Sequence, residues 1–295
     1  MDLIGVAPRM PNRGETIVGT EFYTAPGGKG GNQAVAASKM GAEVRMVGRV
    51  GQDVFGPMLL DSMKGAGVGI RGVSIDADAP TGIALIFLDS DRQNHIVQVP
   101  GANKTGVETI VEAAIGALID ADVLMLQMET PLEVSLRAAQ AAKDLGIRII
   151  WDPAPPTFFS KEIYDLADVL TPNQMEAEYL TGLPVSDVGS AQKAGAALIQ
   201  AGASIAIVKL GMLGTYYVSQ EAEGHVEPFE VEQIESVAAG DAFGGALAVA
   251  MAEGMDLEKA VEYGCAAGAL SVTKVGVQDS IPTRGEVETL LQQIR

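Results

Sequence analysis

The chain has 295 residues and a formal net charge of −18, from 20 Lys and Arg against 38 Asp and Glu. A field of this sign repels nucleic acids and anionic membranes, so we expect neither as a partner. Apolar residues make up 47% of the chain, enough for one large α/β domain, but no apolar run reaches the length of a membrane span. The first residues lack an export-signal pattern, and the lone Cys265 cannot form an internal disulfide, so we expect a cytoplasmic protein.

Short apolar runs alternate with Ala-rich helical patterns along the chain. The expected strands are 44–50, 123–128, 147–152, 169–173 and 205–211, and the expected helices include 31–41, 132–146 and 191–202. Continuous apolar strands separated by helices predict a mostly parallel sheet covered on both faces, in a single α/β domain over 1–295. Two segments with partial alternation, 14–25 and 81–99, are predicted to be β-ribbons of a small sheet that projects from the core as a lid.

The first motif, APGGKGGNQAVAASKMG (25–41), places two Gly pairs around Lys29. The glycines let a ligand approach the backbone, and the helix that Asn32 and Gln33 open offers free N–H donors. With a mobile cation and an amide beside them, these features suit a hydroxyl-rich ligand. The alternative is a Gly-rich turn that caps a core helix.

The second motif, AAGDAFGGALA (238–248), crowds small residues around Asp241 at the start of a helix. Backbone N–H groups at such a helix start can cradle phosphate charge. An acid there would repel a resting phosphate, so Asp241 is a candidate general base that accepts a proton from an attacking hydroxyl. The alternative is that Asp241 is only the N-cap residue.

Three further stretches are candidates for ligand contact. In LTPNQMEAEYLTG (170–182), Asn173 and Glu176 have the spacing of a helix cap, or could organise Mg²⁺ through water and phosphate oxygens. The glycines of VKLGMLGTYYV (208–218) form a turn that could hold a nucleotide. Glu129 follows a core strand directly, and open α/β sheets bind ligands at that end of their strands.

Taken in order, GGKGGNQAVAASKMGA, TPNQMEAEYLTG, KLGMLG and AAGDAFGGA resemble the ribokinase-like (PfkB-type) carbohydrate kinases over essentially the whole chain. The GGKGGNQA form with RGET (13–16) upstream resembles the family members that phosphorylate ribose. The resemblance implies a Rossmann-like three-layer core whose β-sheet lid, approximately 3–26 and 81–99, also forms a dimer contact. It implies in-line transfer from ATP to the 5-hydroxyl of D-ribose, with Mg²⁺ required and K⁺ activating.

The resemblance also implies roles for individual residues. Asp241 matches the catalytic base, and the anion hole matches the backbone of Ala238, Ala239 and Gly240. The sugar would be contacted by Asp241 together with Asp2, Gly28, Lys29, Asn32 and Glu129. ATP would be contacted by Asn173, Lys209, Leu210, Gly211, Met212, Leu213, Gly214, Gly240, Asp241 and Cys265. Glu176 would act on Mg²⁺ indirectly, and K⁺ would be held by Glu235, Val237, Ser271, Lys274, Gly276 and Ser280.

Two departures from the family pattern change what we expect. The family usually has Asp where this chain has Glu235, and the longer side chain changes the reach of a K⁺ ligand. A strand with a sugar-contacting Asn precedes the segment that matches Met1-Asp2-Leu3 in the family, so a first core strand is expected to be missing before Met1. The alternatives are therefore a related kinase for another sugar or a nucleoside, or a catalytically impaired sugar- or nucleotide-binding protein.

Overall fold

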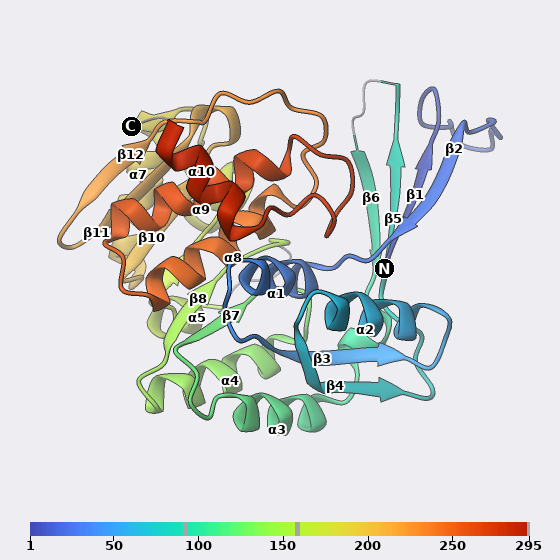
Figure 1. Cartoon of the computed structure of the whole chain (residues 1–295), viewed down its shortest axis with the longest axis horizontal. Coiled ribbons are helices and arrows are strands. Elements are labelled where there is room, and N and C mark those ends of the chain that lie inside the picture. The colour runs from blue at the N-terminus through green and yellow to red at the C-terminus, as the bar shows by residue number, and fades with distance from the viewer. Residues whose placement is uncertain (91–93, 157–159, 294–295) are drawn as a thin grey trace.

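A computed structural model describes residues 1–90, 94–156 and 160–293 of the chain (Figure 1). Its largest sheet has six strands in the order β12-β11-β10-β9-β8-β7. The strands from β7 to β10 run parallel, and β11 and β12 are added antiparallel at one edge. Their bounds are Val123–Leu126 (β7), Arg148–Trp151 (β8), Val169–Leu170 (β9), Ile205–Lys209 (β10), Thr215–Ser219 (β11) and Glu223–Val226 (β12). The strands predicted from 123 onward are therefore present in one mostly parallel sheet.

The strand predicted at 44–50 forms, but in another sheet. It is β3 (Arg45–Gly51), which pairs in parallel with β4 (Gly69–Asp76) in a separate two-stranded sheet, and α2 (Phe55–Gly65) connects the two. Within the described residues, no strand is hydrogen-bonded to the other edge of β3. A strand pattern in the sequence fixes the conformation of a segment but not its neighbours, so the expected place of β3 in the main sheet was wrong.

A third sheet of four strands stands out from the body of the molecule beside α1 (Lys29–Lys39) and α2 (Figure 1). We call it the lid sheet. Its order is β2-β1-β5-β6, with bounds Asp2–Val6 (β1), Glu21–Ala25 (β2), Ile83–Leu88 (β5) and Asn94–Val99 (β6). The ribbon predicted at 81–99 is the antiparallel pair β5 and β6. The ribbon predicted at 14–25 contributes only β2, because irregular backbone precedes Glu21 and the partner of β2 is β1.

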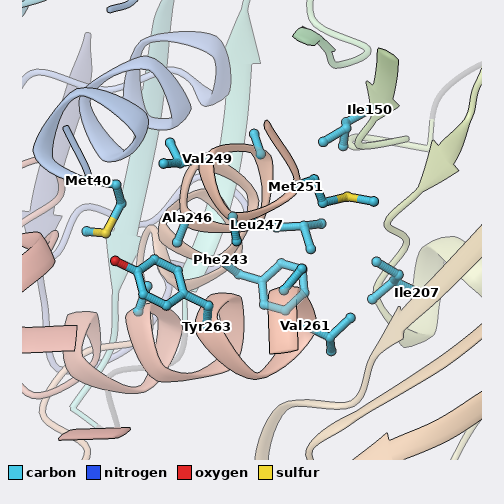
Figure 2. Close-up of a cluster of buried hydrophobic side chains, with 14 of the residues drawn as sticks. Met40, Ile150, Ile207, Phe243, Ala246, Leu247, Val249, Met251, Val261 and Tyr263 are labelled. Carbon is cyan, nitrogen blue, oxygen red and sulfur yellow. The ribbon is translucent and has the colours of Figure 1, made fainter. Parts of the chain in front are cut away.

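Helices cover both faces of the six-stranded sheet. One face is covered by α8 (Ala239–Ala252), α9 (Leu257–Ser271) and α10 (Arg284–Gln293), and the other by α4 (Leu132–Asp144), α5 (Glu162–Leu166) and α7 (Val188–Ala201). Neighbouring residues of β8 point to opposite sides: Ile150 joins the core cluster of the first group, whereas Ile149 and Trp151 join that of the second. Figure 2 shows the first cluster, with side chains of α8 at its centre. Burial on both faces explains why these strands are apolar without alternation, and it confirms the three-layer α/β core. The remaining bounds are Gly101–Lys104 (η1), Val107–Ala117 (α3), Gln174–Thr181 (α6) and Gly211–Leu213 (η2).

The close crossing of α1 and α8 positions the residues of the candidate site. A Cβ atom at Gly245 of α8 would lie 2.4 Å from the Cβ of Ala36 and 2.7 Å from the backbone N of Ala37, both in α1. Only glycine permits this approach, because real Cβ atoms do not come so close to a neighbour. The first turn of α8 is thereby held against the first turns of α1. In the described part of the chain, no helix combines the length and apolarity that a bilayer crossing requires.

Candidate active site

A cavity of about 660 Å³ lies where the lid sheet, the start of α1, the end of β7 and the start of α8 meet. All the residues predicted to contact a sugar line it: Asp2, Gly28, Lys29, Asn32, Glu129 and Asp241. These residues come from four separate parts of the sequence. The structure therefore brings the predicted sugar set around one space, and Val237 and Ala238 line the same space beside the helix start.

Asp241 is not the N-cap of its helix. The N-cap is Ala238, with a left-handed φ of 64° and no capping side chain, and Asp241 is the third residue of α8. Its buried carboxylate instead accepts a 2.8 Å bond from Nδ2 of Asn32 and a 3.1 Å bond from Nε2 of Gln33. The capping alternative is therefore wrong, because both donors come from α1 and point the carboxylate at the cavity.

The cavity gathers carboxylates whose pKa values are raised. Burial raises the pKa of Asp241, although the Lys29 cation and the two amide donors oppose this. Burial also raises the pKa of Asp2 to about 6 and raises the pKa of Glu129. Burial alone would lower the pKa of Lys29, but the surrounding carboxylates raise it above its ordinary value. One lysine thus stays charged among three acids, each with a pKa above its ordinary value.

Glu129 forms hydrogen bonds with both the lid sheet and α1. Its Oε2 accepts a 2.9 Å bond from the backbone N of Lys29, and its Oε1 accepts a 2.7 Å bond from Nε2 of Gln98 in β6. Asp2 of β1 is packed as tightly, because a Cβ at Gly27 would lie 2.2 to 2.5 Å from its carboxylate atoms. The lid sheet thus contributes one acid directly and orients a second one.

The predicted ATP residues form a different group. Among the described residues that line the cavity, there is none from Asn173, the segment 209–214 or Cys265. Asn173 and Glu176 make a reciprocal capping box at the start of α6: the backbone N of Asn173 donates to Oε2 of Glu176 at 2.8 Å, and the backbone N of Glu176 donates to Oδ1 of Asn173 at 2.9 Å. The capping interpretation is correct, and burial raises the pKa of Glu176.

The turn after β10 lies beside that cap, since Asn173 forms a bridge to Lys209. Leu210 is buried, whereas Met212 and Leu213 are exposed at the surface. Cys265 of α9 lies under the end of the turn, where its Sγ is 3.3 Å from Oγ1 of Thr215. Burial raises the pKa of this thiol to about 12, so it stays protonated at neutral pH.

The residues predicted to hold K⁺ also come together, from two segments. The backbone N of Gly276 donates to Oε2 of Glu235 at 3.0 Å, and the backbone N of Glu235 donates to the carbonyl of Val272 at 3.1 Å. Ser271 and Ser280 are fully buried, whereas the side chain of Lys274 points to Glu286 and leaves only its backbone for an ion. The described ranges contain no cluster of three or more His, Cys, Asp or Glu side chains that could hold a metal ion.

Several polar residues of the site were missed from sequence. Asp152 is buried directly after β8 and accepts a 3.0 Å bond from Nε2 of Gln33, which therefore joins it to Asp241. Lys209 forms an ion pair with Asp152, with 3.0 Å between Nζ and Oδ1. The position of Asp152 at the end of a predicted strand, like that of Glu129, was a usable signal. Gln278, which lines the cavity from a loop, had none.

Comparison with known proteins places this geometry in a family. Residues 1–284 match the model of the pfkB family carbohydrate kinases. The ribokinase of Bacillus subtilis is 38% identical over 292 residues, which cover 99% of this chain and 96% of that protein. The solved ribokinase of Thermotoga maritima is 37% identical with a TM-score of 0.88, covering 99% of this chain and 96% of that one.

A second solved structure, the Arabidopsis thaliana ribokinase complexed with ribose and ATP, is 32% identical. Its TM-score is also 0.88, over 99% of this chain and 95% of that chain. The agreement extends over nearly the full length of each protein, and the TM-scores show that it includes the α/β core. The chain belongs to the pfkB family of carbohydrate kinases and is a kinase of that family.

Proposed function

We propose that the chain transfers the γ-phosphoryl group of ATP to the 5-hydroxyl of D-ribose. The observation that carries this proposal is the meeting of Asp241, Asn32 and Lys29 with Asp2 and Glu129 around one cavity. Carboxylates accept hydrogen bonds from sugar hydroxyls, and an amide and an ammonium donate to them, so the set suits a small polyol. The likeness to ribokinases favours ribose over other polyols as that substrate.

Asp241 is the proposed general base. Its carboxylate lines the cavity and lies at the start of α8, where free N–H groups of Ala239 and Gly240 can stabilise phosphoryl charge. A hydroxyl within hydrogen-bond reach of Asp241 would give its proton to that carboxylate as its oxygen attacks the γ-phosphorus atom in line. The bond from that phosphorus to the oxygen shared with the β-phosphate would break, and ADP would leave. The left-handed N-cap at Ala238 supports this role, because it leaves the helix start free of any capping side chain.

ATP would lie on the side of α8 formed by Asn173, the segment 209–214 and Cys265. Glu176 and Asp152 would hold Mg²⁺, through water and phosphate oxygens, because both are buried acids near the helix start and Mg²⁺ commonly takes only one or two carboxylates. When bound, Mg²⁺ would neutralise charge on the transferring group. Closure of the lid sheet would exclude water from the cavity and limit ATP hydrolysis.

Two further parts of the proposal concern K⁺ and assembly. K⁺ activation is proposed through Glu235 and the carbonyls around it, and the contact between Glu235 and Gly276 supports an ordered loop there.

A homodimer is proposed through the lid sheet, which carries several exposed apolar side chains: Phe22, Phe87, Ile96, Val97 and Val99. Light scattering of the protein and of a Phe22→Lys variant tests the dimer, which the variant should weaken.

The function itself is tested by ADP release from ATP with D-ribose, 2-deoxy-D-ribose, D-fructose and a nucleoside, with and without K⁺. The proposal expects D-ribose to give the highest kcat/KM, with K⁺ increasing it and with ribose 5-phosphate as product. Turnover of another sugar or of the nucleoside with greater kcat/KM would favour a related kinase activity. Binding of ATP and ribose without ADP release would favour an impaired binding protein.

A further inference from the structure

Gln278 lies at the end of a chain of hydrogen bonds that leads to Asp241. Its Nε2 donates to Oδ1 of Asn32 at 3.3 Å, and Nδ2 of Asn32 donates to Oδ2 of Asp241 at 2.8 Å. Gln278 is buried and lines the cavity, and it is 246 residues away from Asn32 in the sequence. The two amides therefore link the loop before α10 to the proposed base.

The Asp241 carboxylate decides which group donates and which accepts in this series of hydrogen bonds. An ionised carboxylate only accepts hydrogen bonds, so the Asn32 amide must turn its NH₂ group toward Asp241 and its oxygen away. That oxygen is buried and needs a donor, and Nε2 of Gln278 supplies it. The oxygen of the Gln278 amide accepts a 2.7 Å bond from Oγ of Ser62. Both amide oxygens in this series, those of Asn32 and Gln278, therefore have a donor.

The backbone of Gln278 is anchored as well. Nζ of Lys39, in the last turn of α1, donates to the carbonyl of Gln278 at 2.9 Å and to the carbonyl of Ile281 at 2.8 Å. A Cβ at Gly31 of α1 would come to 3.5 Å from Nε2 of Gln278. The loop is thus fixed to the same helix that carries Asn32, which limits the movement of the two amides relative to each other.

We infer that Gln278 is a positioning residue for phosphoryl transfer, which holds the Asn32 amide so that its NH₂ group stays directed at Asp241. This inference rests on the proposed role of Asp241 as the base. Gln278 acts through Asn32 and does not contact Asp241 itself. Without it, the oxygen of Asn32 loses a buried donor, and the amide is free to rotate away from the carboxylate.

Three substitutions distinguish a role of Gln278 in positioning Asn32 from a role in packing alone. Gln278→Met keeps the length of the side chain but removes the donor, whereas Gln278→Glu places a second acceptor opposite the oxygen of Asn32. Gln140→Met is the matched control, because Gln140 lies on the exposed side of α4, where its Nε2 donates to Oδ1 of Asp144. We expect the control to leave kcat unchanged and Gln278→Met to lower kcat by about tenfold, because the Asn32 bond to the charged Asp241 is then no longer held in place.

The pH profile of kcat tests the same contact. The bond from Asn32 lowers the pKa of Asp241, so loss of that bond in Gln278→Met moves the acid limb of the profile to higher pH. Gln278→Glu is expected to lower kcat more than Gln278→Met, because its carboxylate turns a second acceptor toward the oxygen of Asn32. The charged groups that face Asp241 stay unchanged in all variants: Asp2 in β1, Lys29 in α1, Glu129 after β7, Asp152 after β8, and Lys209 in β10, which pairs with Asp152.

A crystal structure of each variant at pH 8 supplies a readout that does not need turnover. The inference expects the Asn32 side chain to leave Asp241 in Gln278→Glu and to keep its place in Gln140→Met. It is overturned if Asn32 stays in place in both Gln278 variants, or if an active wild-type enzyme and both variants share one kcat profile. If wild-type protein releases no ADP with ribose, the proposed function fails, and the position of Asn32 in the crystals still decides the inference.

Discussion

Nδ2 of Asn32 lies 2.8 Å from Oδ2 of Asp241, although 209 residues separate the two in the sequence. The contact exists because α1 and α8 cross closely at Gly245, which brings the first turns of both helices to one cavity. A buried acid with two amide donors from another helix is not held as a cap of its own helix. The packing of α1 on α8 therefore determines the geometry of the candidate site.

Substitution at Gly245 tests this packing. Gly245→Ala places a methyl group 2.4 Å from Cβ of Ala36, so the helices must separate, and we expect a loss of about 1 to 3 kcal/mol in the free energy of unfolding. The matched control is Gly116→Ala in α3, where a Cβ meets nothing within 4 Å and the helix should gain up to about 1 kcal/mol. Urea unfolding measures both, and a Gly245→Ala variant as stable as wild type contradicts the packing argument.

The proposed contact between Asp2 and the sugar predicts how sugar binding depends on pH. Burial raises this pKa to about 6, so the carboxylate takes up a proton as the pH falls below 6 and accepts hydrogen bonds from hydroxyls less well. We expect the KM for ribose to rise below about pH 6. Asp2→Asn should raise the KM at pH 8 and flatten its rise between pH 7 and 5. A variant with the full wild-type pH dependence would assign the titration to another acid, such as Glu129.

The raised pKa of Asp2 also makes the free energy of unfolding depend on pH. Asp2 binds its proton more tightly in the folded protein than in the unfolded chain, where an Asp carboxyl has its ordinary pKa of 3.8. The folded state therefore holds more protons between about pH 6 and 4, and this group contributes stability as the pH falls through that window. Thermal unfolding of wild type and Asp2→Asn at pH 7 and pH 5 measures the contribution as the difference between the two proteins. Equal shifts of Tm in both would contradict it.

The buried pair of Lys209 and Asp152 supports both helices of the site through Gln33. Removing only the lysine, in Lys209→Met, leaves Asp152 with Gln33 and Thr171 as donors but no cation. We expect a loss of about 3 kcal/mol in the free energy of unfolding, because a buried charge then lacks its partner. Adding Asp152→Asn should restore most of this loss, and a double variant no more stable than Lys209→Met would show that the pair is not coupled.

Cys265 provides a prediction about reactivity. Its pKa is raised to about 12 by burial, so almost no thiolate is present at pH 8. We expect iodoacetamide to alkylate it far more slowly in the folded protein than in urea, as followed by mass spectrometry, because the thiolate is the reactive form. Rapid alkylation of the folded protein at pH 8 would mean that the thiol is more exposed or more acidic than its place beside Thr215 allows.

Sequence patterns were sufficient for those parts of the fold that depend on burial. The strands around Ile150 and Ile207 are apolar on both faces because helices cover both faces, so they could be predicted as strands of a parallel sheet. The neighbours of β3 could not be predicted, because apolar periodicity carries no information about pairing. The ribbon predicted at 14–25 was too long, because only Glu21–Ala25 of it forms a strand, which pairs with β1.

Some residues of the candidate site could likewise be predicted from the sequence, and others could not. Asp241 and Asn32 could be found because small residues and glycines mark their helix starts. Asp152 could have been found from its place after a buried strand, by the reasoning that found Glu129. Gln278 lies in a loop without periodicity, and its contact with Asn32 depends on how α1, α2 and the loop before α10 pack together. Such a contact follows from tertiary structure alone.

The central claim is that Asp241 accepts the proton of the sugar hydroxyl during transfer from ATP. Asp241→Asn keeps the size of the side chain and removes its basicity, so kcat for ribose-dependent ADP release should fall by about 10² to 10⁴. Binding of ADP, measured by calorimetry, and Tm should stay close to wild type. A variant that retains more than about a third of the wild-type kcat at pH 8, with ribose saturating, would contradict the claim.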